Sequence, residues 1–336
     1  MNYRFGALLL IAAACWDGAL STSRANDTSA ELGVGGLTFT KNAEISIESE
    51  ELTITLDAIT VRYTFLNHGT KPITLTVAFP LPDIDLADAA NIAFPASDPL
   101  NYVGFSTKVD GKPISFVTNQ QAFLDNKNVT AKLGEMGIPT FPVGAQQLKI
   151  NELPQKIRER AVAEGLLVES GTNDKGLPLY DATWTLKTSV VRQQTFPPGK
   201  PILVEHRYRS SVGMSFDSIL RPSLRQAKGL EPEVQRYKTK YCVGDDFLKS
   251  LDGLESTDKA RRARIVERRI NYVLKSGANW AGPIKDFHLV VDKGQPDRIV
   301  SFCGQGIQKI SATQLELRAT DFTPTRDLHI LILGPK

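Results

Sequence analysis

The chain has 336 residues, of which 41% are hydrophobic and 23% are charged, and its formal net charge is +3. These values are typical of a globular protein that can bury a core, and the length suffices for two domains. A charge so close to neutral gives no electrostatic reason to expect binding to nucleic acid or to an anionic membrane surface.

The first 25 residues have the features of a secretory signal peptide. Arg4 makes the short start positive, residues 6–14 are all small or apolar, and Ser23-Arg24-Ala25 supplies small residues for cleavage. The apolar run has about half of the ~20 residues that a membrane-spanning helix needs. We therefore expect removal of residues 1–25 by cleavage near Ala25, which would make the mature chain periplasmic or secreted, with no transmembrane segment.

The three cysteines bear on the same question. Ala12 to Cys15 loosely matches a lipoprotein cleavage site, and the alternative to cleavage near Ala25 is a protein lipidated on Cys15. Cys242 and Cys303 remain in the mature chain, where an oxidising compartment favours a disulfide between them over two separate buried thiols. Such a crosslink contributes roughly 4 kcal/mol if its geometry is unstrained.

Residues 26–215 are predicted to form an antiparallel β-sandwich domain. Segments 59–65 and 73–79 alternate apolar and polar residues around the turn residues 67–70, which predicts a β-hairpin with one buried face. Asp110-Gly111 predicts a second, short hairpin. The β pattern breaks at about 118–180, where we expect a helical insertion with a helix over 154–164. Strands resume over 184–190 and 202–208.

Residues 216–336 are predicted to form a smaller α+β domain. Ser256 or Thr257 can cap a basic helix over 258–275 that ends at Gly277. Strands are expected over 287–291, 299–302, 315–317 and 328–333. The predicted fold class for the whole chain is therefore mainly β with helical insertions, in the α+β class.

Familiar catalytic motifs are missing from the sequence. It contains no His-Glu-x-x-His zinc motif, no Gly-x-Ser-x-Gly nucleophile elbow and no phosphate-binding glycine loop. His206 lies on the apolar face of its predicted strand, which favours a buried structural role. We assign no catalytic residue and no cofactor.

Two groups of charged residues are candidate binding sites. Asp83, Asp85 and Asp88 follow a proline-containing turn and are candidate ligands of a calcium ion, although solvated turn acids are the simpler interpretation. Arg261, Arg264 and Arg268 of the predicted basic helix form a possible anion-binding face for a lipid head group, a glycan or an acidic partner. The alternative is a solvated helix face that is partly neutralised by nearby acids.

The segment after the predicted basic helix indicates a structural joint. Trp280 supplies a large apolar anchor, Gly282-Pro283 turns the chain, and Phe287 begins a strand that points inward. We expect Trp280, Pro283 and Phe287 to stabilise the fold.

Three stretches of the sequence resemble one bacterial family. They are residues 25–41, residues 192–209, and the element Trp280-Ala281-Gly282-Pro283-Ile284-Lys285-Asp286-Phe287, which is the most specific and is followed by Ser301-Phe302-Cys303. Together they are similar to domain-of-unknown-function family 4424. The resemblance implies an exported, β-rich envelope protein and brings no assigned catalytic residues with it. A looser likeness in fold is to the vault/inter-α-trypsin type of β-sandwich.

The function that these observations favour is non-enzymatic recognition or assembly at the cell envelope. Two alternatives stay open: a periplasmic enzyme of an unrecognised class that uses carboxylates such as Asp83 and Asp85, and a glycan- or lipid-binding protein. The expected partner is an envelope protein, a glycan or a lipid, and not a nucleic acid.

Overall fold

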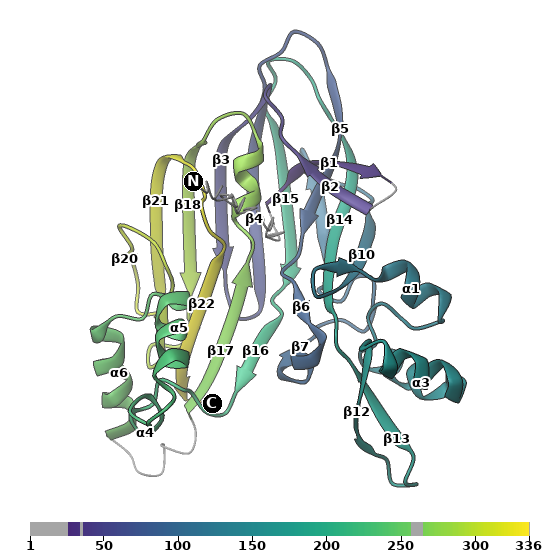
Figure 1. Cartoon of the computed structure of the whole chain (residues 1–336). Coiled ribbons are helices and arrows are strands. Elements are labelled where there is room, and N and C mark those ends of the chain that lie inside the picture. Colours follow the sequence, from purple (N-terminus) through teal and green to yellow (C-terminus); the bar gives the residue numbers. More distant parts are fainter. Residues whose placement is uncertain (1–25, 34–35, 257–264, 336) are drawn as a thin grey trace, which may run out of the picture.

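The computed structural model describes residues 26–33, 36–256 and 265–335. Strands dominate these residues, and helices lie at two places on the outside of the sheets (Figure 1). The predicted fold class, mainly β with helical insertions, is confirmed. Within the described ranges, no helix is long and apolar enough to cross a membrane.

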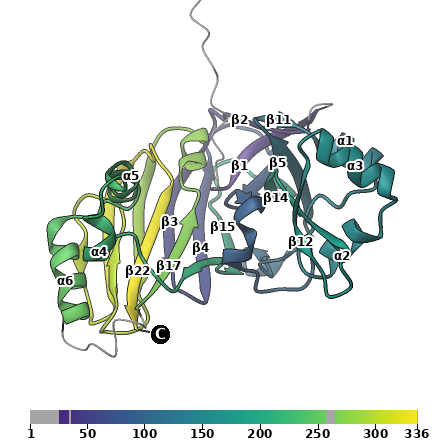
Figure 2. The ribbon, with the colours of Figure 1, turned by 60° about the horizontal axis from the view of Figure 1, so that its bottom comes forward.

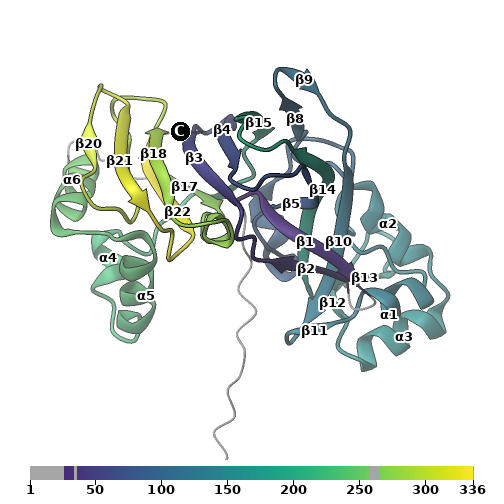
Figure 3. The ribbon, with the colours of Figure 1, turned by 90° about the horizontal axis from the view of Figure 1, so that it is seen from above.

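The largest sheet, here the central sheet, has eight strands (Figure 3). All neighbours are antiparallel except β18 and β3, which are parallel. The order across the sheet is β20 (Gln308–Lys309), β21 (Gln314–Phe322), β18 (Ile284–Asp292), β3 (Ile45–Ile54), β4 (Ala58–Asn67), β15 (Ile202–Arg209), β8 (Ser106–Val109) and β9 (Lys112–Pro113).

Two further sheets are named here after one strand of each. The β14 sheet contains, in order, β11 (Lys127–Asn128), β10 (Val117–Leu124), β14 (Thr185–Phe196), β5 (Ile73–Pro80), β1 (Thr28–Gly33) and β2 (Gly36–Thr40), with β6 (Ile84–Asp85) also paired to β14. The β22 sheet contains β19 (Ile299–Ser301), β22 (Leu328–Pro335), β17 (Ile265–Tyr272), β16 (Val212–Ser215) and β7 (Ile92–Ala93).

Both smaller sheets pack on the same face of the central sheet. Tyr63 and Phe65 are two residues apart on β4 and therefore share a face. Phe65 packs against Phe196 of β14, with ring centroids 5.7 Å apart. Tyr63 Oη lies 3.2 Å from Tyr272 Oη of β17. Buried side chains from all three sheets accordingly form one continuous hydrophobic core.

The helices cover the two ends of this assembly (Figure 2). α4 (Pro222–Arg225), α5 (Glu231–Tyr241) and α6 (Asp245–Ser256) pack on the outer face of the β22 sheet, where Leu331 and Leu333 join a second, smaller core. At the other end lie α1 (Thr130–Glu135), α2 (Ala145–Glu152), α3 (Gln155–Ala163) and the hairpin of β12 (Leu167–Thr172) and β13 (Pro178–Ala182). The described residues also contain two short 3-10 helices, η1 (Leu86–Asn91) and η3 (Lys275–Asn279).

The predicted hairpin over 59–79 is wrong, although both of its strands form. β4 pairs with β3 and β15 in the central sheet, whereas β5 pairs with β14 and β1. Asn67 ends β4, and its side-chain amide donates to the carbonyl oxygens of Lys71 and Phe196 at 2.9 and 2.8 Å. These bonds hold the segment 67–70 as a crossover between two sheets. Residues 110–111 do connect a hairpin, as predicted, because β8 pairs directly with β9.

The basic helix predicted over 258–275 is also wrong wherever the structure describes that range. Ile265–Tyr272 is strand β17, and each of its residues pairs with β22. Val266 and Ile270 are four residues apart, which fits one face of a helix and one face of a strand equally well. The long apolar strand β22 pairs with this segment, and the segment therefore forms a strand and not a helix.

Pairing of β18 with β3 brings strands from both sides of residue 216 into the central sheet. Strand hydrogen bonds therefore link the two predicted domains, 26–215 and 216–336. The predicted division itself stays a prediction. Separate expression of the two segments would test whether either folds without the other.

Candidate functional site

A cleft of about 200 Å³ opens where α5, β16, β17 and the segment after β5 meet. We call it the tyrosine cleft because four tyrosines line it: Tyr102, Tyr208, Tyr237 and Tyr241. Its polar lining consists of Asp83, Asp88, Ser211, Lys240, Arg269 and Asn271. Aromatic faces, cations and carboxylates thus meet in one concave place.

Helix α5 forms one wall of the tyrosine cleft. Its first turn contains a proline and acidic residues and its last turn contains lysines, which is the arrangement that the helix dipole favours. Lys240 and Tyr241 follow Tyr237 by three and four residues, so both side chains lie beside that of Tyr237 on the helix. The rings of Tyr237 and Tyr241 lie 4.9 Å apart, and Tyr241 is buried against the β22 sheet. Packing of α5 on that sheet therefore places all three side chains at the cleft.

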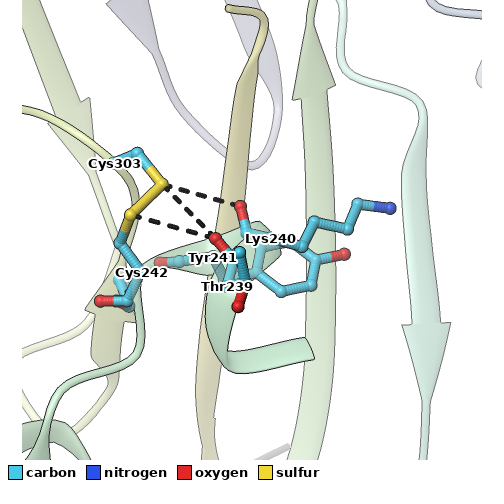
Figure 4. The surroundings of a disulfide bond; sticks show 6 residues. Thr239, Lys240, Tyr241, Cys242 and Cys303 are labelled. Carbon is cyan, nitrogen blue, oxygen red and sulfur yellow. Dashed lines mark hydrogen bonds between the residues drawn. A yellow bond between two sulfur atoms is a disulfide. The ribbon is translucent and has the colours of Figure 1, made fainter. Parts of the chain in front are cut away.

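The predicted disulfide between Cys242 and Cys303 is present and fastens the end of this helix (Figure 4). Cys242 has a left-handed backbone conformation at the helix end, and the two Cα atoms are 5.1 Å apart. The Cys303 Sγ lies 3.9 Å from the carbonyl oxygen of Thr239. In the figure, the side chains of Lys240 and Tyr241 point away from the disulfide. The crosslink therefore fixes the end of α5 on the side that faces away from the cleft.

Lys240 is a cation that has no counter-charge among the described residues. Burial and the neighbouring charge of Arg269 lower the pKa of Lys240. Among the described residues its ammonium forms no hydrogen bond or ion pair, and its contact is the Tyr241 ring, whose centroid is 5.4 Å away. Arg269, in contrast, pairs with Glu267 at 3.6 Å. An anion in the cleft would relieve the repulsion between Lys240 and Arg269.

Two hydroxyl groups of cleft residues have unused hydrogen-bonding capacity. Tyr208 Oη and Ser211 Oγ are buried, and neither has a partner among the described residues. Burial also raises the pKa of Tyr208, so that this phenol stays protonated. A buried polar group without a partner costs about 1–3 kcal/mol, which a bound water or ligand can recover.

The structure does not gather the three aspartates of the calcium hypothesis. Asp83 lies 3.5 Å from Lys187, and Asp88 accepts a hydrogen bond from Asn91. Asp85 accepts a backbone hydrogen bond at the start of η1 and is not part of the cleft lining. In the described ranges no three His, Cys, Asp or Glu residues lie close enough to hold a metal ion. Asp83 and Asp88 share the tyrosine cleft, whereas Asp85 does not.

The predicted arginine face is not formed by a helix in the described part. Arg261 and Arg264 lie outside the described residues. Arg268 is buried in β17, and its guanidinium donates to the carbonyl oxygens of Val266 and Pro335 at 3.2 and 3.3 Å. Because the side chains of neighbouring residues on a strand point to opposite faces, Arg269 and not Arg268 lines the tyrosine cleft.

The three residues of the predicted joint lie at the start of β18. Trp280 is only 4% exposed, its ring lies 4.9 Å from that of Phe65, and its Nε1 donates to the backbone carbonyl oxygen of Asp27. Phe287 is buried in the core. Pro283 is half-buried and follows Gly282, whose positive φ of 72° forms the turn.

One buried polar group is predicted only in part, because the sequence indicates a buried structural role for His206 but not its partners. Arg192 donates two hydrogen bonds to the carboxylate of Asp27, at 2.6 and 3.1 Å, and His206 Nε2 lies 3.1 Å from the same carboxylate. Burial alone would raise the pKa of Asp27, but Arg192 and His206 hold it well below its ordinary value. Burial lowers the pKa of His206. All three residues are buried, so this group stabilises the junction of the sheets and offers no accessible chemistry.

Comparison with known proteins places the chain in a family. A solved structure of a candidate nutrient-binding protein from Legionella pneumophila is similar, with 16% identity and a TM-score of 0.46 over 92% of this chain and 70% of that one. An M1 zinc metallopeptidase from Deinococcus radiodurans matches at 11% identity and a TM-score of 0.23, and this chain spans 44% of its length. No curated protein matches. The family described as Domain of unknown function (DUF4424) matches residues 25–331, and the chain therefore belongs to that family.

Proposed function

We propose that this protein is exported and that it recognises a small anionic sugar, such as a uronic acid unit of an envelope glycan, in the tyrosine cleft. The observation that carries the proposal is Lys240, an exposed cation with no counter-charge among the described residues, in a cleft with aromatic walls. This is a binding function that requires no catalytic step.

The lining of the tyrosine cleft fits such a ligand group by group. The apolar face of a sugar ring packs on an aromatic side chain, and Tyr237, which is partly exposed, supplies one at the cleft. A carboxylate would sit between Lys240 and Arg269. Carboxylate and amide oxygens accept hydrogen bonds from sugar hydroxyls. Asp88 is exposed at the cleft and can accept such a bond.

Size and polarity favour a sugar over a lipid. Pockets for drug-sized ligands measure about 300–1,000 Å³, and a cleft of about 200 Å³ accepts a smaller molecule. The lining carries two cations and two carboxylates, and covering charged groups with an acyl chain is costly because it removes them from water. The leader over residues 1–25 supports a periplasmic or secreted location, where polysaccharides are available.

The test is a titration of the purified mature chain with glucuronate and galacturonate, and with glucose and galactose as neutral counterparts, by isothermal calorimetry. We expect saturable binding of a uronate and at least tenfold weaker binding of the neutral sugars. Lys240→Met keeps the aliphatic stem and should remove the preference for the acid. Arg236→Ala changes an exposed cation on the same helix that does not line the cleft, and it should change nothing. Equal binding by Lys240→Met and the unmodified chain would refute the proposal.

A further inference from the structure

Asn26 is the first described residue, and it is completely buried where the three sheets meet. Its side-chain Oδ1 accepts hydrogen bonds from Tyr63 Oη at 2.9 Å and from Tyr272 Oη at 2.7 Å. Its backbone N–H donates to Ser276 Oγ, and the same hydroxyl donates back to the Asn26 carbonyl oxygen at 2.8 Å. A Cβ on Gly277 would lie 2.5 Å from Asn26 Nδ2. The protein thus has a closely fitted site for this one residue.

Glu50 is a carboxyl group at this site that has no cationic partner among the described residues. It is completely buried on β3, and its Oε2 accepts a hydrogen bond from Asn26 Nδ2 at 3.0 Å. Its Oε1 has no partner among the described residues. Burial raises the pKa of Glu50 to about 8 in the uncleaved chain, so that the carboxyl is mostly uncharged at neutral pH. A buried carboxyl of this kind gains most from a cation placed beside it.

Cleavage after Ala25 would create such a cation on Asn26. The backbone nitrogen, an amide with one proton in the longer chain, becomes an ammonium with three protons. One proton is already accepted by Ser276 Oγ, and the residue that bears the ammonium already contacts Glu50 through its side chain. Other charges at the junction do not compete, because the carboxylate of Asp27 is already bound by Arg192.

We propose that the α-ammonium group released by cleavage before Asn26 is a buried structural ion that pairs with the carboxylate of Glu50 and completes the core. Removal of the leader then does more than free the protein from the export machinery, because the mature fold gains an ion pair that the precursor cannot form. This inference rests on the proposed export but not on the proposed ligand.

The experiment compares two chains that differ by one residue. One begins at Asn26, produced with a protease that leaves no extra residue, and the other keeps Ala25 in front of it. Each is made with Glu50 and with Glu50→Gln, and thermal unfolding is measured at pH 7. We expect a melting temperature several degrees higher for the chain that begins at Asn26. Glu50→Gln should lower it in that chain, and should leave it unchanged or raise it in the chain that keeps Ala25.

An equal effect of Glu50→Gln in both chains would overturn the inference, as would equal stability of the two parent chains. Glu51→Gln is the matched control, because Glu51 is the next residue on β3 and its side chain is 61% exposed. If the Glu50 variants fail to fold, the inference is tested instead by the pKa of the Asn26 amine in the folded parent chain. Pairing with Glu50 predicts a pKa above the ordinary range of about 7.7–8.0, and a value inside or below that range would contradict it.

The natural cleavage position is established separately from the intact mass of the exported protein. Cleavage directly before Asn26 supports the inference. Cleavage at any other bond would overturn it, while the sugar titration of the tyrosine cleft would still stand or fall on its own result.

Discussion

Replacement of Trp280 by alanine tests the joint between the three sheets. The indole is 4% exposed and packs between the rings of Phe65 and Phe196. Truncation of a buried tryptophan to alanine costs about 3–5 kcal/mol. The variant also leaves the carbonyl oxygen of Asp27 without its indole donor, which adds about 1 kcal/mol or more. The expected loss is therefore about 4–6 kcal/mol.

That loss is large compared with the total stability of a typical protein, about 5–15 kcal/mol. In a protein of this size each kcal/mol corresponds to roughly 2–4 °C in melting temperature, so a decrease of about 10 °C or more is expected. Urea denaturation followed by tyrosine and tryptophan fluorescence gives the free energy of unfolding. Trp280→Phe keeps an aromatic ring and removes only the N–H donor and part of the volume, and it should cost about half as much.

A free energy of unfolding within about 1 kcal/mol of the parent value for Trp280→Ala would refute the reasoning. It would mean that Trp280 is exposed in solution and available for binding. Equal losses for the alanine and phenylalanine variants would instead assign the effect to the hydrogen bond and not to packing.

Three further predictions concern the disulfide, the buried ion pair and the cleft. Reduction of the bond between Cys242 and Cys303, which closes a loop with a sequence separation of 61 residues, should cost about 4 kcal/mol, measured by urea denaturation with and without reductant. The pKa of Asp27 is held below its ordinary value of 3.8, so its contribution is present above that pH and is lost as the pH falls further. Asp27→Asn should therefore make the free energy of unfolding depend less on pH in the acid range. It should also cost about 3–5 kcal/mol at pH 7, because it leaves Arg192 unpaired. An unchanged pH dependence in the acid range would contradict this. Because the pKa of Lys240 lies below 10.5, calorimetry should show weaker uronate binding as the pH rises through the alkaline range, while constant affinity up to pH 10.5 would argue against contact with Lys240.

Most strands could be predicted from the sequence because their signal is local. Alternation over 59–65 and 73–79 predicts both strands correctly, and Asp110-Gly111 predicts its hairpin, since φ is positive at both residues. Assignment of strand partners fails, because β4 and β5 pair with strands more than a hundred residues away in sequence, β15 and β14. Sequence periodicity contains no information about such partners.

The candidate site could be predicted only in fragments. The calcium hypothesis picks out Asp83 and Asp88, and the structure places both at a cleft with Lys240, whose helix α5 is absent from the sequence-based prediction. Its signals were present: Pro232 in the first turn, acids around it and lysines in the last turn. The cleft itself draws on residues from 59 to 271, and no local pattern predicts their meeting.

The central claim, that the tyrosine cleft holds an anionic sugar, is tested most directly by mapping the site on the protein itself. Backbone and side-chain NMR shifts of the mature chain would be followed during titration with glucuronate and galacturonate. The account predicts that the largest shifts for the bound uronate cluster at Tyr237, Lys240 and Tyr241, and that they vanish in Lys240→Met. Saturable shifts clustered elsewhere, for example on the exposed face of the central sheet around Arg62 and Glu205, or no saturable shifts with either uronate, would contradict it.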